Sequence, residues 1–326
     1  MLRACLAGGI VVAACGAPPT TPSNGFNTTD AVQALLAEIV DTMQQQSFKR
    51  DVVDWPALRS AVLVRSAGAS RIVDAFPAIQ LAFQMLNDSH SRYVSASGIS
   101  INHWTLNCST SGIDVAVVPP GIGYIRVLTT GGTTAAAYAG AVQSAIRAAD
   151  SDDTVGWIVD LRGNSGGSTY AMLAGVGPIL GDGVAGAFIN LDGVKTEWGY
   201  RSGAPNASGA TLNGNLVVIP STVYQVRRQH PRVAVLSDQS NMSAGESTLI
   251  AFIGRPDTRV FGLPSCGVST GVAGLPMRDG ATLFLARSLM ADRTGKTYGG
   301  VVLPDEHIAN QAQQVARAVQ WLQSGQ

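Results

Sequence analysis

The sequence has little charge. Only 13% of its 326 residues are charged, and 22 basic residues balance 22 acidic ones. Proteins that bind nucleic acid or an anionic membrane surface collect basic residues on one face. This composition supplies no such electrostatic footprint, so we expect no nucleic-acid partner.

Long apolar runs are also missing after the amino terminus. No later stretch approaches 18 continuous apolar residues, so none is expected to span a membrane. Residues 1–15 hold one early basic residue, a short apolar run and small residues before a cysteine, which predicts a signal peptide over residues 1–14. Val12 to Cys15 resembles a bacterial lipoprotein cleavage box. We therefore expect Cys15 to be lipidated, with a plain secretory signal as the alternative.

Residues 15–30 are rich in proline, threonine, serine, glycine and asparagine, which predicts a flexible tether. The protein is then expected to be exported to the bacterial cell envelope. A lipid anchor would be its one attachment to a membrane.

Cysteine is scarce as well, with four in the chain. Cys5 lies in the predicted signal and Cys15 is assigned to the lipid, which leaves Cys108 and Cys266. In an exported protein such a pair predicts a disulfide, although two free buried thiols are the alternative.

The remaining composition favours a large α/β fold. Hydrophobic residues make up 46% of the chain, which supplies a sizeable core, and 37 glycines suit many turns. Apolar spacing predicts a small helical subdomain over residues 31–97. Residues 98–326 alternate strands with helices and form the predicted core domain, with a polar loop at 192–215 beside the cleft.

A strand, turn and helix succeed one another between residues 231 and 250. The apolar run 233–236 predicts a buried strand, residues 237–241 a turn, and residues 244–252 a helix. Ser243 therefore lies where amides at the helix start point at any charge developing beside its hydroxyl. The alternative is that Ser243 is only an N-cap, with Glu246 completing a capping box.

A second strand ends in a glycine-rich turn. Residues 157–161 predict a buried strand, followed by Arg-Gly-Asn-Ser-Gly-Gly over 162–167. Gly166 and Gly167 permit backbone geometry closed to other residues, so an amide there could stabilise an oxyanion. A phosphate-binding turn is the alternative, but neither G-x-G-x-x-G nor G-x-x-x-x-G-K-[ST] is present.

Three segments together resemble one family. The runs 160–167 (Asp-Leu-Arg-Gly-Asn-Ser-Gly-Gly), 243–246 (Ser-Ala-Gly-Glu) and 300–305 (Gly-Val-Val-Leu-Pro-Asp) look like the ordered signatures of the tail-specific, or C-terminal-processing, serine proteases. The resemblance implies the spiral β/α core shared with Clp protease and crotonase. It also implies a serine peptidase acting on peptides or proteins, without a cofactor or metal.

The family pattern implies Ser243 as nucleophile, with the amides of Ala244 and Gly167 (or Gly166) around the oxyanion. Most members use a lysine about 25 residues after the serine as the base. Residues 247–276 contain no lysine. A smaller branch, similar to the core of the tricorn protease, uses a histidine preceded by serine. Ser89-His90 fits that pattern, so His90 is the predicted base; the alternative is a histidine that only caps a helix or packs.

The carboxylate that orients the histidine in that branch is missing. Its expected place is occupied by Tyr298 and two glycines. Ser89 could position the imidazole, and the carboxylates that could replace the missing group are those of Asp88, Glu246 and Glu306. Loss of such a carboxylate can slow a serine protease by on the order of 10⁴, so reduced activity is a real alternative.

Two further functions stay open on the sequence alone. Residues 97–121 are too few for the peptide-binding PDZ domain that most relatives insert there. A tethered, catalytically weak or inactive lipoprotein could hold an apolar ligand or peptide on the same scaffold. A serine esterase would use the same Ser243 with a differently shaped pocket.

Overall fold

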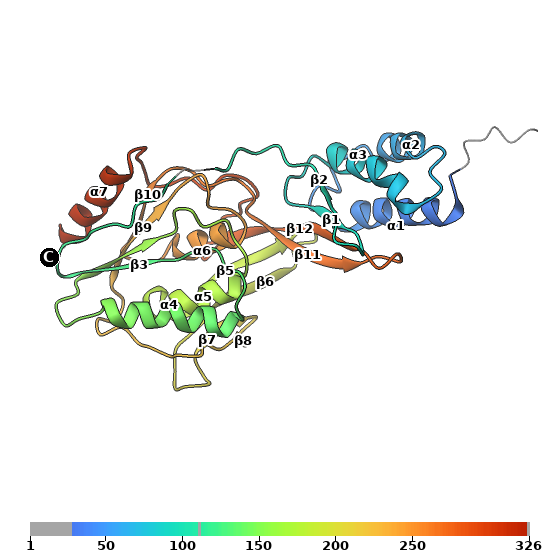
Figure 1. Ribbon diagram of the computed structural model, residues 1–326. Helices are drawn as coiled ribbons and strands as arrows, with labels where there is room; N and C mark the ends of the chain where they lie inside the picture. Colours follow the sequence, from blue (N-terminus) through green and yellow to red (C-terminus); the bar gives the residue numbers. More distant parts are fainter. Residues whose placement is uncertain (1–27, 110–111, 325–326) are drawn as a thin grey trace, which may run out of the picture.

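The computed structural model describes residues 28–109 and 112–324 (Figure 1). The predicted signal peptide, the predicted lipidation at Cys15 and most of the tether lie outside these residues. Within them, no helix combines the length and the apolar composition that crossing a membrane would require.

Helices form in the amino-terminal region, where apolar spacing predicted them, after Ser243 as predicted, and elsewhere in the core. They are α1 (Asp30–Gln46), α2 (Trp55–Arg65), the short 3-10 helix η1 (Ile72–Ala75), α3 (Phe76–Leu86), α4 (Ala135–Ala149), α5 (Thr169–Leu180), α6 (Ala244–Phe252) and α7 (Gln311–Gln323). The strands are β1 (Arg92–Val94), β2 (Ser100–Asn102), β3 (Ile122–Arg126), β4 (Gly156–Asp160), β5 (Gly183–Asn190), β6 (Lys195–Arg201), β7 (Gly209–Leu212), β8 (Asn215–Val218), β9 (Arg232–Ser237), β10 (Thr258–Gly262), β11 (Thr270–Pro276), β12 (Thr282–Asp292) and β13 (Glu306–His307).

A parallel sheet forms the centre of the larger part of the molecule. Its order is β13-β10-β9-β4-β3, and every neighbouring pair is parallel. The side chains of β4 and β9 alternate between two apolar clusters, one shared with α4, α5 and α6 and the other with α7. Because both faces are covered, these strands are apolar throughout, as the sequence indicates.

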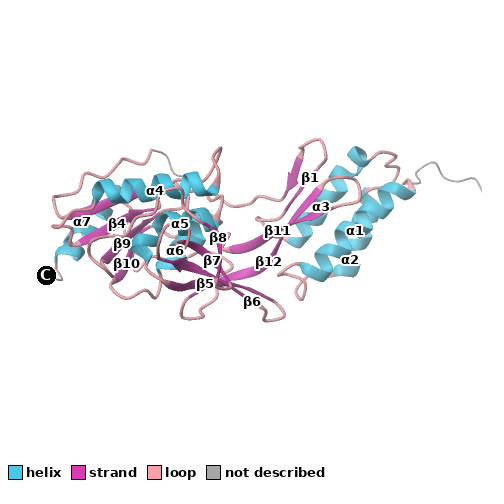
Figure 2. Ribbon diagram, turned by 90° about the horizontal axis from the view of Figure 1, so that it is seen from below, coloured by secondary structure: helices cyan, strands magenta, loops and turns pink. Residues whose placement is uncertain are grey.

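An antiparallel sheet connects this core to the helices α1 to α3. Its order is β2-β1-β12-β5-β6-β7-β8, with β11 also paired to β12. The long strand β12 pairs with β1 near its start and with β5 near its end. Figures 1 and 2 show β11 and β12 running from the core toward the amino-terminal helices.

The amino-terminal helices pack on the start of β12. Their apolar cluster includes Leu35, Leu58 and Phe83 from the helices together with Leu283 and Leu285 from β12. The helical region is therefore completed by residues from far along the chain. Packing thus continues across the domain boundary predicted at residue 97, and that boundary stays a prediction.

The prediction of a loop over residues 192–215 is wrong. This segment contains β6 and β7, which pair with each other and with β5 and β8. Only the middle of β6 is buried, so its sequence shows neither a continuous apolar run nor a clean alternation.

The predicted pairing of Cys108 with Cys266 is present as a disulfide. It joins the segment after β2 to the segment before β11, across 158 residues of sequence, with the two Cα atoms 5.1 Å apart. The bridge therefore ties the chain entering the core to the segment between β10 and β11.

Replacing both cysteines by alanine should lower the free energy of unfolding by about 3 to 5 kcal/mol, because a loop this long loses much of its unfolded-state entropy when closed. Urea denaturation of the parent and the Cys108→Ala/Cys266→Ala variant measures the difference. Alkylation of the unfolded, unreduced parent is the control. If both thiols react, the bridge is not formed and the prediction is wrong.

Candidate active site

Ser243 occupies a sharp turn between β9 and α6. It is the N-cap residue of α6, with φ 54° and ψ −116°. A side chain in such a region costs of order 1–3 kcal/mol and persists only where the surroundings enforce it. Glu246 supplies part of that enforcement, because its Oε2 accepts the Ser243 amide at 2.9 Å. The capping box with Glu246 is thus present, and the Ser243 hydroxyl is still directed at a second group.

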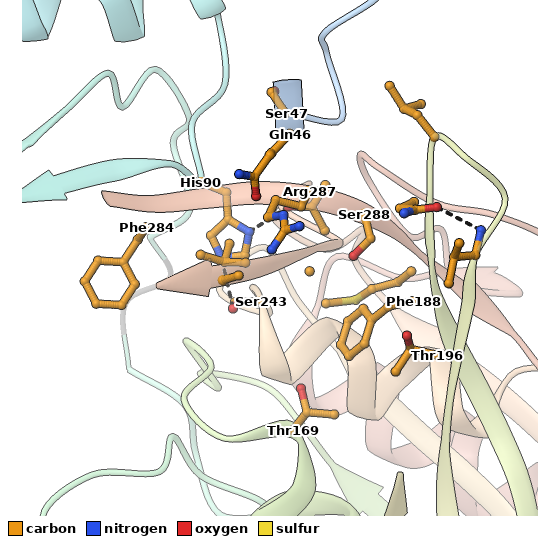
Figure 3. A pocket seen from close by; sticks show the side chains of 18 of the residues that line it. Gln46, Ser47, His90, Thr169, Phe188, Thr196, Ser243, Phe284, Arg287 and Ser288 are labelled. Carbon is orange, nitrogen blue, oxygen red and sulfur yellow. Dashed lines mark hydrogen bonds between the residues drawn. The ribbon is translucent and has the colours of Figure 1, made fainter. Parts of the chain in front are cut away.

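That second group is His90. The αL residue Asn87 ends α3, and His90 lies in the short turn between α3 and β1. His90 Nε2 is 3.0 Å from Ser243 Oγ, and His90 Nδ1 is 2.7 Å from Thr270 Oγ1 at the start of β11. Figure 3 shows the imidazole directed toward Ser243. Residues separated by 153 positions thus form a serine–histidine pair.

Burial keeps this imidazole neutral at physiological pH. It lowers the pKa of His90 to about 4; Asp88 acts in the opposite direction and Arg92 in the same one. In the neutral tautomer with its proton on Nδ1, His90 donates to Thr270 Oγ1 and leaves the Nε2 lone pair for the Ser243 hydroxyl proton. That is the form in which a histidine can act as a general base.

The residues predicted to orient His90 lie elsewhere. The Ser89 hydroxyl is 3.2 Å from Thr105 Oγ1, and the two ring nitrogens of His90 contact Thr270 and Ser243 instead. Asp88 accepts the His90 backbone amide at 3.0 Å and so fixes the turn rather than the ring. Glu306 forms ion pairs with arginines on β10 and α7, at 3.2 and 2.8 Å.

The group that contacts His90 Nδ1 is the hydroxyl of Thr270, a contact that sequence reasoning missed. It is buried and hydrogen-bonded to His90 Nδ1. The one sequence signal for Thr270 was that it lies in the stretch where most relatives carry the lysine that acts as the base. A hydroxyl there is too common to single out.

Glu246 has a different role from the one predicted. Its carboxylate is fully buried and accepts four hydrogen bonds, from Ser243 N (2.9 Å), Ser265 Oγ (2.6 Å), Gly267 N (2.9 Å) and Val268 N (3.0 Å). Burial raises the pKa of Glu246 to about 7, while the hydrogen bonds act to lower it. The carboxylate therefore connects the turn at Ser243 to the segment that leads into β11.

The glycine turn after β4 lies against the Ser243 turn. A Cβ on Gly166 would be 3.0 Å from Ser243 Cβ, and one on Gly167 would be 1.9 Å from Thr130 Oγ1, so both positions require glycine. The Gly166 amide donates to Asn164 Oδ1 at 2.9 Å. Among residues 28–109 and 112–324, the amides of Gly167 and Ala244 have no hydrogen-bond acceptor.

The other motif residues hold these turns in place. Asp160 and Arg162 form a buried bidentate ion pair, with contacts of 2.8 and 2.6 Å, and Arg162 also reaches Gln314 on α7. The third motif joins the site through Ser265, whose amide donates to Val302 O at 3.0 Å. All three segments that carried the family resemblance therefore meet around Ser243.

The site opens into a cleft of about 990 Å³ between the core and the amino-terminal helices. One wall is the end of α1 with the residues after it, and another is the sheet around β5, β11 and β12. Side chains on opposite sides include Gln46, Phe188, Thr196 and Phe284 (Figure 3). A cleft of this size can hold several residues of an extended peptide.

The chain belongs to peptidase family S41, whose model matches residues 121–308. This match covers more than half of the chain and includes the three motifs. The predicted family is thereby confirmed; the finer assignment to a tricorn-like branch stays a prediction.

Similar proteins agree with the fold. The nisin-resistance protein of Lactococcus lactis subsp. lactis is 23% identical over 298 residues, covering 90% of this chain and 87% of the relative. A lipoprotein from Streptococcus agalactiae superposes with a TM-score of 0.69 at 17% identity, over 97% of this chain and 100% of that one. The photosystem II D1 C-terminal processing protease gives 0.57 at 13% identity, over 89% and 98%. The Clp/crotonase-like α/β fold is confirmed.

Replacing Glu246 by glutamine should lower the free energy of unfolding by about 2 kcal/mol at pH 8. A carboxamide keeps the shape, but its NH₂ group faces a backbone N–H and leaves that buried donor without an acceptor. Chemical denaturation measures the loss. Glu197→Gln, on β6 and half-buried, is the matched control and should change stability little. Equal stability of Glu246→Gln and the parent would contradict the role given to this carboxylate.

Proposed function

We propose that the protein is a serine peptidase in which Ser243 is the nucleophile and His90 the general base. The observation that carries the proposal is the 3.0 Å contact between His90 Nε2 and Ser243 Oγ inside a large cleft. A neutral imidazole in hydrogen-bond contact with a serine on a sharp turn meets the geometric requirement for nucleophilic catalysis.

The chemistry follows from this geometry. Ser243 Oγ attacks the carbonyl carbon of a peptide bond while His90 Nε2 takes the hydroxyl proton. The amides of Ala244 and Gly167 then donate to the oxyanion, each worth roughly 3 to 4 kcal/mol. As the intermediate collapses, the C–N bond breaks and His90 returns the proton to the leaving amine. A water molecule, deprotonated by the same histidine, releases the acyl group.

Gly166 is less suited to the oxyanion role than Gly167. Its amide already donates to Asn164 Oδ1, whereas the Gly167 amide is free among the described residues. Gly167 also lines the cleft. We therefore assign the second donor to Gly167.

Thr270 takes the orienting role in this mechanism. Its hydroxyl accepts from Nδ1–H in the tautomer that catalysis needs, but a neutral group stabilises the developing imidazolium less than a carboxylate does. We therefore expect slower turnover than in a serine protease with a full triad. The lack of a carboxylate beside His90 Nδ1 also favours the alternative, a catalytically weak protein that binds peptides.

The substrate class we propose is peptides in the cell envelope. The protein would reach this compartment by export and would be retained there by a lipid on Cys15. The cleft is open enough for a peptide chain, and a similar solved structure is a lipoprotein. The name of the similar nisin-resistance protein adds nisin to the substrates that should be tested first.

Fluorophosphonate labelling of the full-length chain should modify Ser243 and be abolished in Ser243→Ala. His90→Ala should slow labelling by about 10²-fold or more, since general-base catalysis contributes on that scale. Thr270→Val removes one hydroxyl at constant volume and should slow labelling by about tenfold. Gel fluorescence over time gives the rates.

The labelling experiment also separates the alternatives. A folded parent that is not labelled would refute the hydrolase and favour the binding protein. Labelling accompanied by turnover of esters but of no peptide would identify the esterase instead.

The pH profile should report the buried histidine. Since only neutral His90 can accept the proton, kcat/KM should be constant at neutral pH and should fall as the pH drops through about 4, the lowered pKa of His90. Rates between pH 3.5 and 8, with tryptophan fluorescence to verify folding, give the profile. Because the pKa of Glu246 is raised to about 7, the profile is also measured with Glu246→Gln, and an acid limb near 6.5, the unshifted value for histidine, that persists in this variant would contradict the assignment.

A further inference from the structure

The cleft contains more positive than negative charge. Three arginines line it, against a single carboxylate, that of Asp192. Asp192 is paired with Arg50 at 2.5 Å, and Arg92 lies over the Phe284 ring at 4.2 Å from its centre. The guanidinium of the remaining arginine, Arg287, has no hydrogen bond or ion pair with any residue that the structure describes.

A β-bulge directs Arg287 into the cleft. Along β11 and β12, Gly271 pairs with Ser288 and the next residue, Val272, pairs with Ala286. Arg287 is therefore the extra residue of β12, opposite no residue of β11. Bulges re-aim a side chain and are common beside active sites. Arg287 and His90 both line the cleft (Figure 3).

The bulge shares its support with the catalytic histidine. The Ala286 amide donates to Ser91 Oγ at 2.9 Å, and Ala286 O accepts the Phe48 amide at 3.1 Å. The Ser91 hydroxyl donates in turn to Asp88, which also accepts the His90 amide at 3.0 Å. One network of buried hydrogen bonds thus fixes both the base and the backbone that presents Arg287.

A guanidinium presents a planar fork of donors that matches a carboxylate in two parallel hydrogen bonds. Arg287 is half-buried and without a protein partner among the described residues, so a ligand carboxylate in the cleft would not have to displace an internal ion pair. We propose that Arg287 binds a carboxylate of the substrate and makes the cleft selective for peptides carrying one near the cleaved bond. This rests on the proposed peptidase function.

The carboxylate can come from an aspartate or glutamate side chain or from the C-terminus of the peptide. Four matched forms of a fluorescent decapeptide library distinguish these sources: glutamate or glutamine inside the peptide, each with a free C-terminal carboxylate or a C-terminal amide. Binding is measured by fluorescence anisotropy with full-length Ser243→Ala, which cannot cleave the probes.

Ser243→Ala should bind at least one acidic form about tenfold tighter than its neutral counterpart, as charge-assisted hydrogen bonds allow. A glutamate-over-glutamine preference identifies a side chain, and an acid-over-amide preference identifies the C-terminus. The preference should disappear when Arg287→Met is added and be partly kept with Arg287→Lys. Arg201→Met, an exposed arginine at the end of β6, is the matched control and should leave it unchanged.

Equal binding of all four forms, or binding of none, overturns the proposal, as does a preference that survives Arg287→Met. If that variant does not fold, Arg287→Gln is measured in its place under the same criteria. Because binding needs no turnover, the outcome is independent of the labelling experiment. An acid preference that depends on Arg287, in a protein that fluorophosphonate leaves unlabelled, would retain this site and refute the peptidase.

Discussion

The site depends on one buried carboxylate. Glu246 accepts two hydrogen bonds on each oxygen, and the four donors come from the Ser243 turn and from residues 265–268. One of these bonds, from the Ser243 amide, helps to hold Ser243 at its positive φ. The same segment leads into β11, where Thr270 meets His90. A single side chain thus links the Ser243 turn to the strand that contacts His90.

The long strand β12 joins the amino-terminal helices to the larger part of the molecule. Near its start it completes the core of the amino-terminal helices, and near its end it pairs with β5 in the larger part of the molecule. His90 belongs to the turn between α3 and β1, and β1 is itself paired with β12. The histidine therefore reaches Ser243 because the antiparallel sheet carries the amino-terminal helices to the edge of the cleft. The bulge that presents Arg287 lies in the middle of the same strand.

The parts of the fold and the site that depend on neighbouring residues in the sequence could be predicted. The fully buried strands β4 and β9 are continuous apolar runs, and the strand-turn-helix around Ser243 follows from its turn residues. The amphipathic helices at the amino terminus follow from their spacing. The half-exposed strand β6 was missed because its burial is uneven. None of Ser89, Asp88, Glu246 and Glu306, the candidates for orienting His90, could be preferred from sequence, and the residue that contacts His90 Nδ1 is Thr270, 180 positions away.

The sequence by itself determined the family, through three motifs in order, and the residues able to act as nucleophile and base. The tertiary structure alone decided that Ser243 and His90 meet, that Thr270 contacts the other ring nitrogen of His90, and that the Arg287 guanidinium lines the cleft with no partner among the described residues. The reason is that these contacts join residues 153 and 180 positions apart, or depend on a one-residue shift in strand register. Periodicity and turn chemistry encode what lies within a few residues, and packing across the whole chain sets the rest.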